Sequence, residues 1–200
     1  MPRKSRECLP DTHNHAISRC IEKKPLMRQS RMKDLMHDVL NEALEKYDFE
    51  LISYAIMDNH FHFFIKTLKG GETISRIMQF IKSQFARRYN KMMDRIGPFW
   101  NERFINLIIE RTTNPVHYFW NVFLYMGYNP VRSKYVTDPR KYAYGGFRAY
   151  VDREYIPPVP ITFSEYFQKL GNTYEERLKK LLEYEDMYRK RIFPKEIFEK

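Results

Sequence analysis

Two histidines interrupt an otherwise almost wholly apolar run at residues 57–65. The run is short, aromatic and β-branched, and two glycines at 70–71 soon follow it, a pattern typical of a buried strand. Side chains two residues apart point to the same face of a strand, so His60 and His62 should project side by side. A buried imidazole without a partner costs on the order of 1–3 kcal/mol, and one divalent metal ion would satisfy both rings. The run therefore predicts half of a metal site.

Two other interpretations of these histidines stay open. His60 and His62 could form a structural pair that is hydrogen-bonded to the backbone. A second His-x-His pair, His13 and His15, lies in a predicted strand over residues 13–21 and competes as a ligand site. It is the weaker candidate because its neighbours are polar and it lies where the strand begins. His15 could still contact the metal-binding histidines without binding the metal itself.

The composition favours a nucleic-acid partner. The chain has 200 residues, a net charge of +10 and an isoelectric point near 9.5, and such a surplus favours a polyanion, with nucleic acid ahead of membrane. Two cysteines, Cys8 and Cys20, are too few for a disulfide framework, and no apolar window is long enough for a signal peptide or a membrane span. We expect a cytoplasmic bacterial protein that is nucleoid-associated when on DNA.

The order of predicted elements indicates an α+β fold. The first six follow the β-α-β-β-α-β order of ferredoxin-like folds, with helices on one face of an antiparallel sheet and the other face open. An added helix then starts at Asn114-Pro115, a strong capping signal, and should end near Tyr128 because the residue before Pro130 avoids the α region. The predicted elements are strands at 13–21, 49–57, 57–65 and 104–110, and helices at 30–47, 73–93 and 115–128.

Three segments are expected along the chain. Residues 1–12 should form a flexible basic arm, residues 13–150 the catalytic domain, and residues 151–200 a Pro-rich connector with a C-terminal helical extension. Thr173 and Glu176 fit a capping box that begins the last helix. The role of residues 151–200 is left open.

The helix after Pro115 carries the second half of the predicted chemistry. Tyr125 and Asn129 are four residues apart, so they share a helix face. An asparagine oxygen suits Mg²⁺ or Mn²⁺, and two histidines with one amide would leave positions open for a phosphate and water. Phenol is a poor nucleophile near neutral pH, with a pKa of about 10, but a neighbouring cation and a positioned phosphate offset that weakness.

Four segments carry a resemblance to a known family. Residues 57–62 resemble the HUH motif of single-tyrosine transposases, in which two histidines flank a hydrophobic residue. Residues 123–132 are similar to the tyrosine-helix signature of the REP-associated tyrosine transposase branch. Residues 97–104 and 17–19 fit two further segments of that branch, in the same order. The resemblance covers roughly residues 12–135.

The resemblance implies a metal-dependent endonuclease and strand transferase that acts on single-stranded DNA beside hairpins. It implies that Tyr125 attacks the scissile phosphate to leave a 5′-phosphotyrosine link and a free 3′-hydroxyl, with His60, His62 and Asn129 as ligands of Mg²⁺ or Mn²⁺. The resemblance implies neither a small-molecule cofactor nor a membrane partner. A monomer is expected, although some relatives are homodimers. This chain has Asp58 where many relatives have proline, which should alter the turn and leave the ligand set intact.

Several of these roles have structural alternatives. Tyr118 and Tyr128 are fallback nucleophiles, and Asn129 could serve only to end its helix. The basic residues of the 73–93 helix could contact DNA phosphates or simply form a solvated face. The candidate DNA contacts are Arg19, Arg76, Lys82, Arg87, Arg88, Lys91, Trp100 and Arg103.

Two other functions fit the same pattern. One is a basic ferredoxin-like module that binds structured DNA or RNA without catalysis and holds a structural metal. The other is metal-dependent hydrolysis by activated water, with no covalent protein–DNA species. The leading hypothesis is DNA transposition or host hairpin processing through a covalent tyrosine link.

Overall fold

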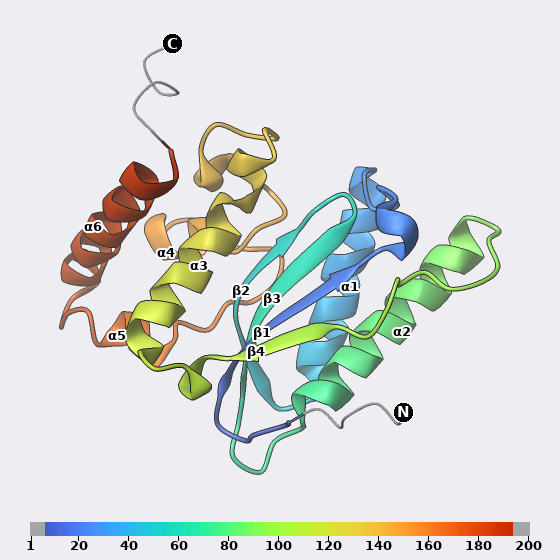
Figure 1. Cartoon of the computed structure of the whole chain (residues 1–200), viewed down its shortest axis with the longest axis horizontal. Helices are drawn as coiled ribbons and strands as arrows, with labels where there is room; N and C mark the ends of the chain where they lie inside the picture. The colour runs from blue at the N-terminus through green and yellow to red at the C-terminus, as the bar shows by residue number, and fades with distance from the viewer. Residues whose placement is uncertain (1–6, 194–200) are drawn as a thin grey trace.

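A four-stranded antiparallel sheet lies at the centre of the computed structural model, which describes residues 7–193 (Figure 1). The strand order is β2-β3-β1-β4, so the third strand along the chain pairs with both the first and the second. This arrangement confirms the α+β, ferredoxin-like prediction. The strands are β1 (His13–Arg19), β2 (Phe49–Ile56), β3 (His60–Thr67) and β4 (Ile105–Ile108).

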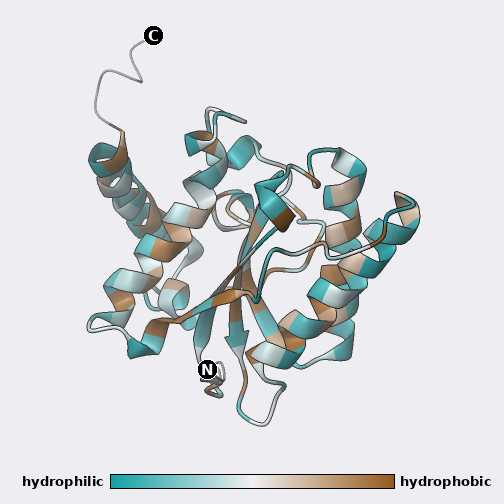
Figure 2. Cartoon of the chain, turned by 45° about the vertical axis from the view of Figure 1, so that its right-hand side comes forward, coloured by the Kyte–Doolittle hydropathy of each residue, from teal (hydrophilic) through white to brown (hydrophobic). Residues whose placement is uncertain are grey.

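Two long helices cover one face of this sheet. They are α1 (Ser30–Lys46) and α2 (Ile74–Met92), and each buries an apolar stripe against the strands. Hydropathy varies from residue to residue along both helices, as expected for helices with one buried side (Figure 2). Phe61, Phe63 and Ile65 of β3 pack into this first core, so the predicted two-residue alternation in β3 is confirmed.

The other face of the sheet is covered as well. Helix α3 (Pro115–Arg132) lies against it, followed by the elements of the C-terminal third (Figure 1). These are α4 (Arg148–Val151), α5 (Glu165–Gln168) and α6 (Tyr174–Ile192). Elsewhere along the described chain, short 3₁₀ turns lie at Ile21–Lys23, Ile109–Arg111 and Pro139–Lys141. The face that the ferredoxin-like order alone would leave open is thus occupied by the added helices.

Helix α3 begins as predicted and ends later than predicted. The side chain of Asn114 accepts a hydrogen bond from the backbone N–H of His117, and Pro115 is the first helical residue. The prediction that the helix ends near Tyr128 is wrong, because it continues through Pro130 to Arg132. A proline in a helix removes a backbone hydrogen-bond donor, and Pro130 is tolerated here in a buried position within the last turn of α3.

Helix α6 shares a second core with α3. Leu181 and Tyr188 pack in the same apolar cluster as Trp120 and Phe123. The capping box that begins the helix is present, with Thr173 and Glu176 exchanging their hydrogen bonds. Residues of the C-terminal third are therefore packed against the helix that carries Tyr125.

The described part of the N-terminal arm contacts the fold. Glu7 pairs with Arg111, and the Cys8 sulfur lies 3.1 Å from the Ser75 hydroxyl of α2. Residues 1–6 of the predicted arm lie outside the described residues. Within residues 7–193 no helix is both long and apolar enough to cross a membrane.

Candidate active site

The paired histidines lie on the face of β3 that meets α3. His62 is buried, and its Nδ1 atom lies 2.9 Å from Nε2 of His15 on the neighbouring strand β1. His60 is partly exposed, and its Nδ1 lies 2.6 Å from the side-chain oxygen of Asn59. The rings of His60 and His62 are 5.0 Å apart between centroids, so they project side by side as the strand alternation predicts.

Helix α3 places Asn129 beside the imidazoles of His60 and His62. The Nδ2 atom of Asn129 lies 3.3 Å from Nε2 of His62, and its side chain also hydrogen-bonds to His60. The carboxamide therefore spans the two rings. A half-turn of that group exchanges its nitrogen for its oxygen, so it can face either ring as donor or as acceptor.

Tyr125 lies one helical turn from Asn129, beside the rings of His62 and His15. Its ring centroid is 5.5 Å from that of His62 and 6.5 Å from that of His15. The guanidinium of Arg132 lies 5.2 Å from the centre of the phenol ring. The predicted convergence of two strand histidines with two residues of a later helix is therefore present in the geometry.

The chemistry of this donor set fits a divalent metal ion. Burial lowers the pKa of His15 and of His60 to about 4, and it holds the pKa of His62 well below 6.5, with nearby positive charge adding to the effect. All three imidazoles are therefore neutral at pH 7, which is the form that binds metals. Among residues 7–193 no three His, Cys, Asp or Glu side chains cluster suitably for a metal, so a site here would depend on the amide of Asn129.

The competing His13–His15 pair is divided between two environments. His13 is fully buried and its Nδ1 lies 2.7 Å from the carboxylate of Glu110, among the rings of Phe119 and Tyr166. His15 instead contacts His62. The pair thus does not form one ligand site, and only His15 reaches the candidate centre.

The fallback tyrosines are placed differently from Tyr125. Tyr128 is buried, and its hydroxyl donates to the carboxylate of Glu185 at 2.5 Å. Burial and that carboxylate raise the pKa of Tyr128, which disfavours it as a nucleophile. Tyr118 lies on the same side of α3 as Tyr125, two helical turns earlier.

Most of the candidate DNA contacts lie away from these histidines. Helix α2 covers the opposite face of the sheet, and Arg88 on it holds Glu42 of α1 through two hydrogen bonds of 2.6 Å. Arg19 ends β1 directly opposite His60 and lowers the pKa of that histidine. The other α2 residues Arg76, Arg87 and Lys91 are exposed on α2.

A second group of candidate contacts lines a groove of about 650 Å³ between α2 and the segment that precedes β4. Lys82, Trp100 and Arg103 all contribute to it. The indole N–H of Trp100 donates to the backbone carbonyl of Lys82 at 2.9 Å, and the ring packs edge-on against Phe61. Trp100 is therefore anchored to the first core.

The sequence pattern missed the role of Asp58 in the turn before β3. Its buried carboxylate accepts hydrogen bonds from Lys33 at 2.8 Å and from Arg28 at 3.4 Å. Tyr135, three residues beyond the end of α3, also hydrogen-bonds to it. Asp58 thus joins the turn that leads to His60 with the segment that follows the tyrosine helix. The only sequence signal was the departure from proline at this position.

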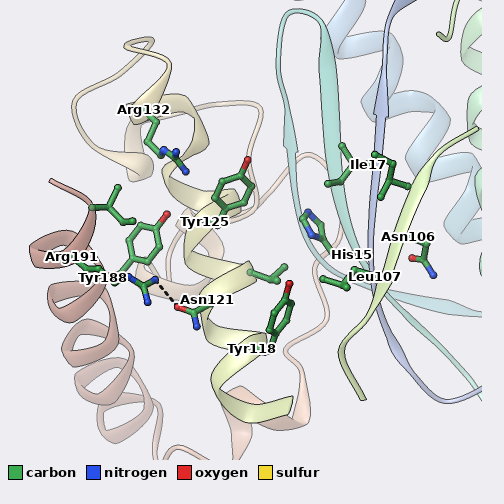
Figure 3. A pocket seen from close by; sticks show the side chains of 13 residues that line it. His15, Ile17, Asn106, Leu107, Tyr118, Asn121, Tyr125, Arg132, Tyr188 and Arg191 are labelled. Carbon is green, nitrogen blue, oxygen red and sulfur yellow. Dashed lines mark hydrogen bonds between the residues drawn. The ribbon is translucent and has the colours of Figure 1, made fainter. Parts of the chain in front are cut away.

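An open cleft of about 480 Å³ adjoins Tyr125 (Figure 3). Strands β1 and β4 form one wall, and helices α3 and α6 form the other. Arg191 of α6 donates a hydrogen bond of 2.7 Å to the side-chain oxygen of Asn121 on α3 at this cleft. His15, Tyr118, Arg132 and Tyr188 are also among its lining residues.

Comparison with known proteins points to transposases. A family model described as "Transposase IS200 like" matches residues 8–116. A Haemophilus influenzae protein named as a REP-associated tyrosine transposase is 24% identical over 148 residues, which are 66% of this chain and 82% of that protein. The solved structure of a REP-associated tyrosine transposase bound to a REP hairpin superposes with a TM-score of 0.62 at 17% identity. That match covers 83% of this chain and 96% of the other, and it shows a shared fold.

Proposed function

Because the chain belongs to the IS200-like transposase family, we propose that it nicks and rejoins single-stranded DNA beside hairpins, with Tyr125 as the nucleophile. His60, His62 and Asn129 would hold the Mg²⁺ or Mn²⁺ ion that the reaction needs. The observation that carries this proposal is the 5.5 Å separation between the rings of Tyr125 and His62, which come from elements far apart in the sequence. Within residues 7–193, no other tyrosine ring contacts that of His62.

The covalent step conserves the energy of the phosphodiester. The Tyr125 oxygen forms a bond to the scissile phosphorus as the bond from phosphorus to the 3′-oxygen breaks, which leaves a 5′-phosphotyrosine link and a 3′-hydroxyl. The phenolic proton passes to water, and the departing 3′-oxygen takes up a proton from water. Attack by another 3′-hydroxyl reverses these changes, so rejoining requires no external energy source.

Each group of the site has a part in that step. The bound ion would polarise a phosphoryl oxygen and stabilise the charge that develops in the transition state. Asn129 and Tyr125 are held one turn apart on a helix, so the phosphate is presented to the phenol in a fixed position. Arg132, with its guanidinium 5.2 Å from the phenol ring, supplies positive charge where the oxygen becomes anionic.

The net charge of the chain and its structural similarity to a hairpin-binding protein support a hairpin-bearing substrate. The net charge of +10 favours a polyanion. The solved structure with the same fold is of a protein bound to a REP hairpin, and we extend that class of ligand to this chain. We also propose that the chain acts as a monomer, because one chain supplies Tyr125, Asn129 and both histidines.

The proposal is tested by a covalent-adduct assay. The protein is incubated with a panel of labelled hairpins that carry single-stranded flanks, with Mn²⁺ or with EDTA, and analysed on denaturing gels. We expect an adduct that requires Mn²⁺ and is lost in Tyr125→Phe but retained in Tyr118→Phe. Adduct formation by Tyr125→Phe would contradict the assignment. Hairpin binding with no adduct under any metal would favour the non-catalytic module, and strand cleavage without an adduct would favour hydrolysis by activated water.

A further inference from the structure

We propose that the cleft between α6 and the sheet binds the single-stranded DNA that continues from the scissile phosphate, and that Arg191 of α6 holds a phosphate of that strand. This inference rests on the proposed function, because it places the scissile phosphate at Tyr125. It gives residues 151–193 a role in binding substrate. The matched family model ends at residue 116, before α6 begins.

The cleft is continuous with the candidate active site. Tyr125 and His15 contribute to its wall, and both contact His62 through their rings. A strand whose phosphate lies at Tyr125 must leave the site on one side, and Tyr125 itself lines the cleft (Figure 3). Its volume of about 480 Å³ falls within the range of roughly 300–1,000 Å³ that is typical of small-molecule sites, so it can take about a nucleotide.

The lining of the cleft is complementary to a nucleotide. Arg132 and Arg191 bring two guanidinium groups, which bind phosphate oxygens in a planar fork, and no Asp or Glu of residues 7–193 lines the cleft. Tyr118 adds an aromatic ring, and Ile17 and Leu107 add apolar surface from the strands, where a base can stack. This combination of cationic and aromatic groups is what sequence-tolerant binding of single strands requires.

Helix α6 is held firmly enough to position Arg191. Glu185, six residues earlier on α6, is buried and accepts a hydrogen bond from Tyr128 of α3 at 2.5 Å. It also accepts two from Arg140, at 2.6 and 2.9 Å. The hydrogen bond from Arg191 to Asn121 adds to these contacts and holds the guanidinium beside the cleft.

The test compares hairpins with and without a short single-stranded tail. Fluorescence anisotropy is measured in EDTA, so that the DNA stays intact, for a blunt hairpin and for the same hairpin with a four-nucleotide tail on either side. The variant is Arg191→Gln. Lys190→Gln is the matched control, because Lys190 is a neighbouring cation that pairs with Asp186 and does not line the cleft. Thermal unfolding confirms that both variants fold.

We expect one of the two tails to strengthen hairpin binding about tenfold in the wild type and in Lys190→Gln. In Arg191→Gln most of that gain should be lost, with unchanged affinity for the blunt hairpin. A tail of 5-iododeoxyuridine should photocrosslink to Tyr118 or Tyr188 in the wild type. An undiminished tail effect in Arg191→Gln, or crosslinks confined to the groove around Trp100, would overturn the proposal.

The assay separates this inference from the proposed function. A tail effect that depends on Arg191 in a protein that forms no covalent adduct would support strand binding in the cleft and contradict the nuclease. A metal-dependent adduct in a protein whose gain in affinity from the tail is the same in Arg191→Gln would support the nuclease and contradict strand binding in the cleft.

Discussion

The Nε2 atom of His15 lies 2.9 Å from the Nδ1 atom of His62, so histidines from two neighbouring strands share one hydrogen bond. Both rings are neutral at pH 7 because burial lowers their pKa values, so one ring nitrogen donates and the other accepts. This bond fixes the orientation of His62 and leaves its other nitrogen, Nε2, facing Asn129. A partner behind a metal-binding histidine orients the ring in this way in metal sites generally.

Replacing His15 should weaken metal binding. His15→Phe keeps a ring in the buried position but removes the hydrogen bond that orients His62, and such losses typically reduce metal affinity 10–100-fold. Isothermal titration with Mn²⁺ measures the change. His117→Ala, at an exposed histidine of α3, serves as the control and should leave the affinity unchanged. Equal Mn²⁺ affinity in the His15 variant and the wild type would show that His62 needs no such partner.

The metal-free protein should lose stability on mild acidification. Burial lowers the pKa of His15 and of His60 to about 4, whereas the unfolded chain titrates near 6.5. Between these values the unfolded chain binds protons that the folded chain does not, so the free energy of unfolding falls as pH falls. Each such histidine contributes up to about 1.4 kcal/mol per pH unit.

Urea unfolding in EDTA at pH 7, 6 and 5 measures this slope. His15→Phe removes one of the buried imidazoles, so its free energy of unfolding should vary less steeply with pH than that of the wild type. Identical slopes for the two proteins would mean that His15 titrates normally in the folded state.

The buried pair of Lys33 and Asp58 should stabilise the turn before His60. Their side chains are 7% and 11% exposed and their charged atoms are 2.8 Å apart. Breaking a buried pair leaves one charge with fewer partners and typically costs about 3–5 kcal/mol, although Arg28 and Tyr135 remain beside Asp58 and reduce the loss. We expect Lys33→Met to lower the free energy of unfolding by about 3 kcal/mol.

Lys169→Met provides the comparison for Lys33→Met. Lys169 pairs with Glu165 at 3.0 Å on the surface, where such pairs contribute less than about 1 kcal/mol. Denaturant titration of both variants measures the difference. Similar small effects in the two variants would contradict a structural role for the Lys33–Asp58 pair.

Tyr128 should matter for stability and not for chemistry. Tyr128→Phe removes the hydrogen bond to the buried carboxylate of Glu185, and such a loss costs about 1–3 kcal/mol. For a chain of this size that corresponds to a fall in melting temperature of roughly 2–4 °C for each kcal/mol. The covalent adduct should still form, and its absence from correctly folded Tyr128→Phe would reopen the choice of nucleophile.

Much of the fold followed from local patterns. The alternation around Phe61 and Phe63 predicted the two faces of β3, and Asn114-Pro115 predicted the start of α3. These signals are local, because strand alternation and helix capping depend on residues within a few positions of one another. The continuation of α3 past Pro130 could not be predicted in this way, since packing of distant residues outweighs a local backbone preference there.

The candidate site was predictable where its residues are close in sequence. His60 with His62, and Tyr125 with Asn129, follow from spacing along one strand and one helix. The division of His13 from His15 was not predictable, because it depends on Glu110, nearly a hundred residues away. Long-range partners also explain why Arg191 was not foreseen, since its position depends on how α6 packs on α3.

The Tyr125 oxygen should form the bond to DNA, and mass spectrometry of the adduct tests this directly. The adduct is digested with trypsin and nuclease, and the peptide spanning residues 112–132 is fragmented in a mass spectrometer to locate the attached nucleotide. This peptide also contains Tyr118 and Tyr128, so the measurement distinguishes all three candidates. We expect a nucleotide on Tyr125 alone, and a nucleotide on Tyr118 or Tyr128 would overturn the assignment of the nucleophile.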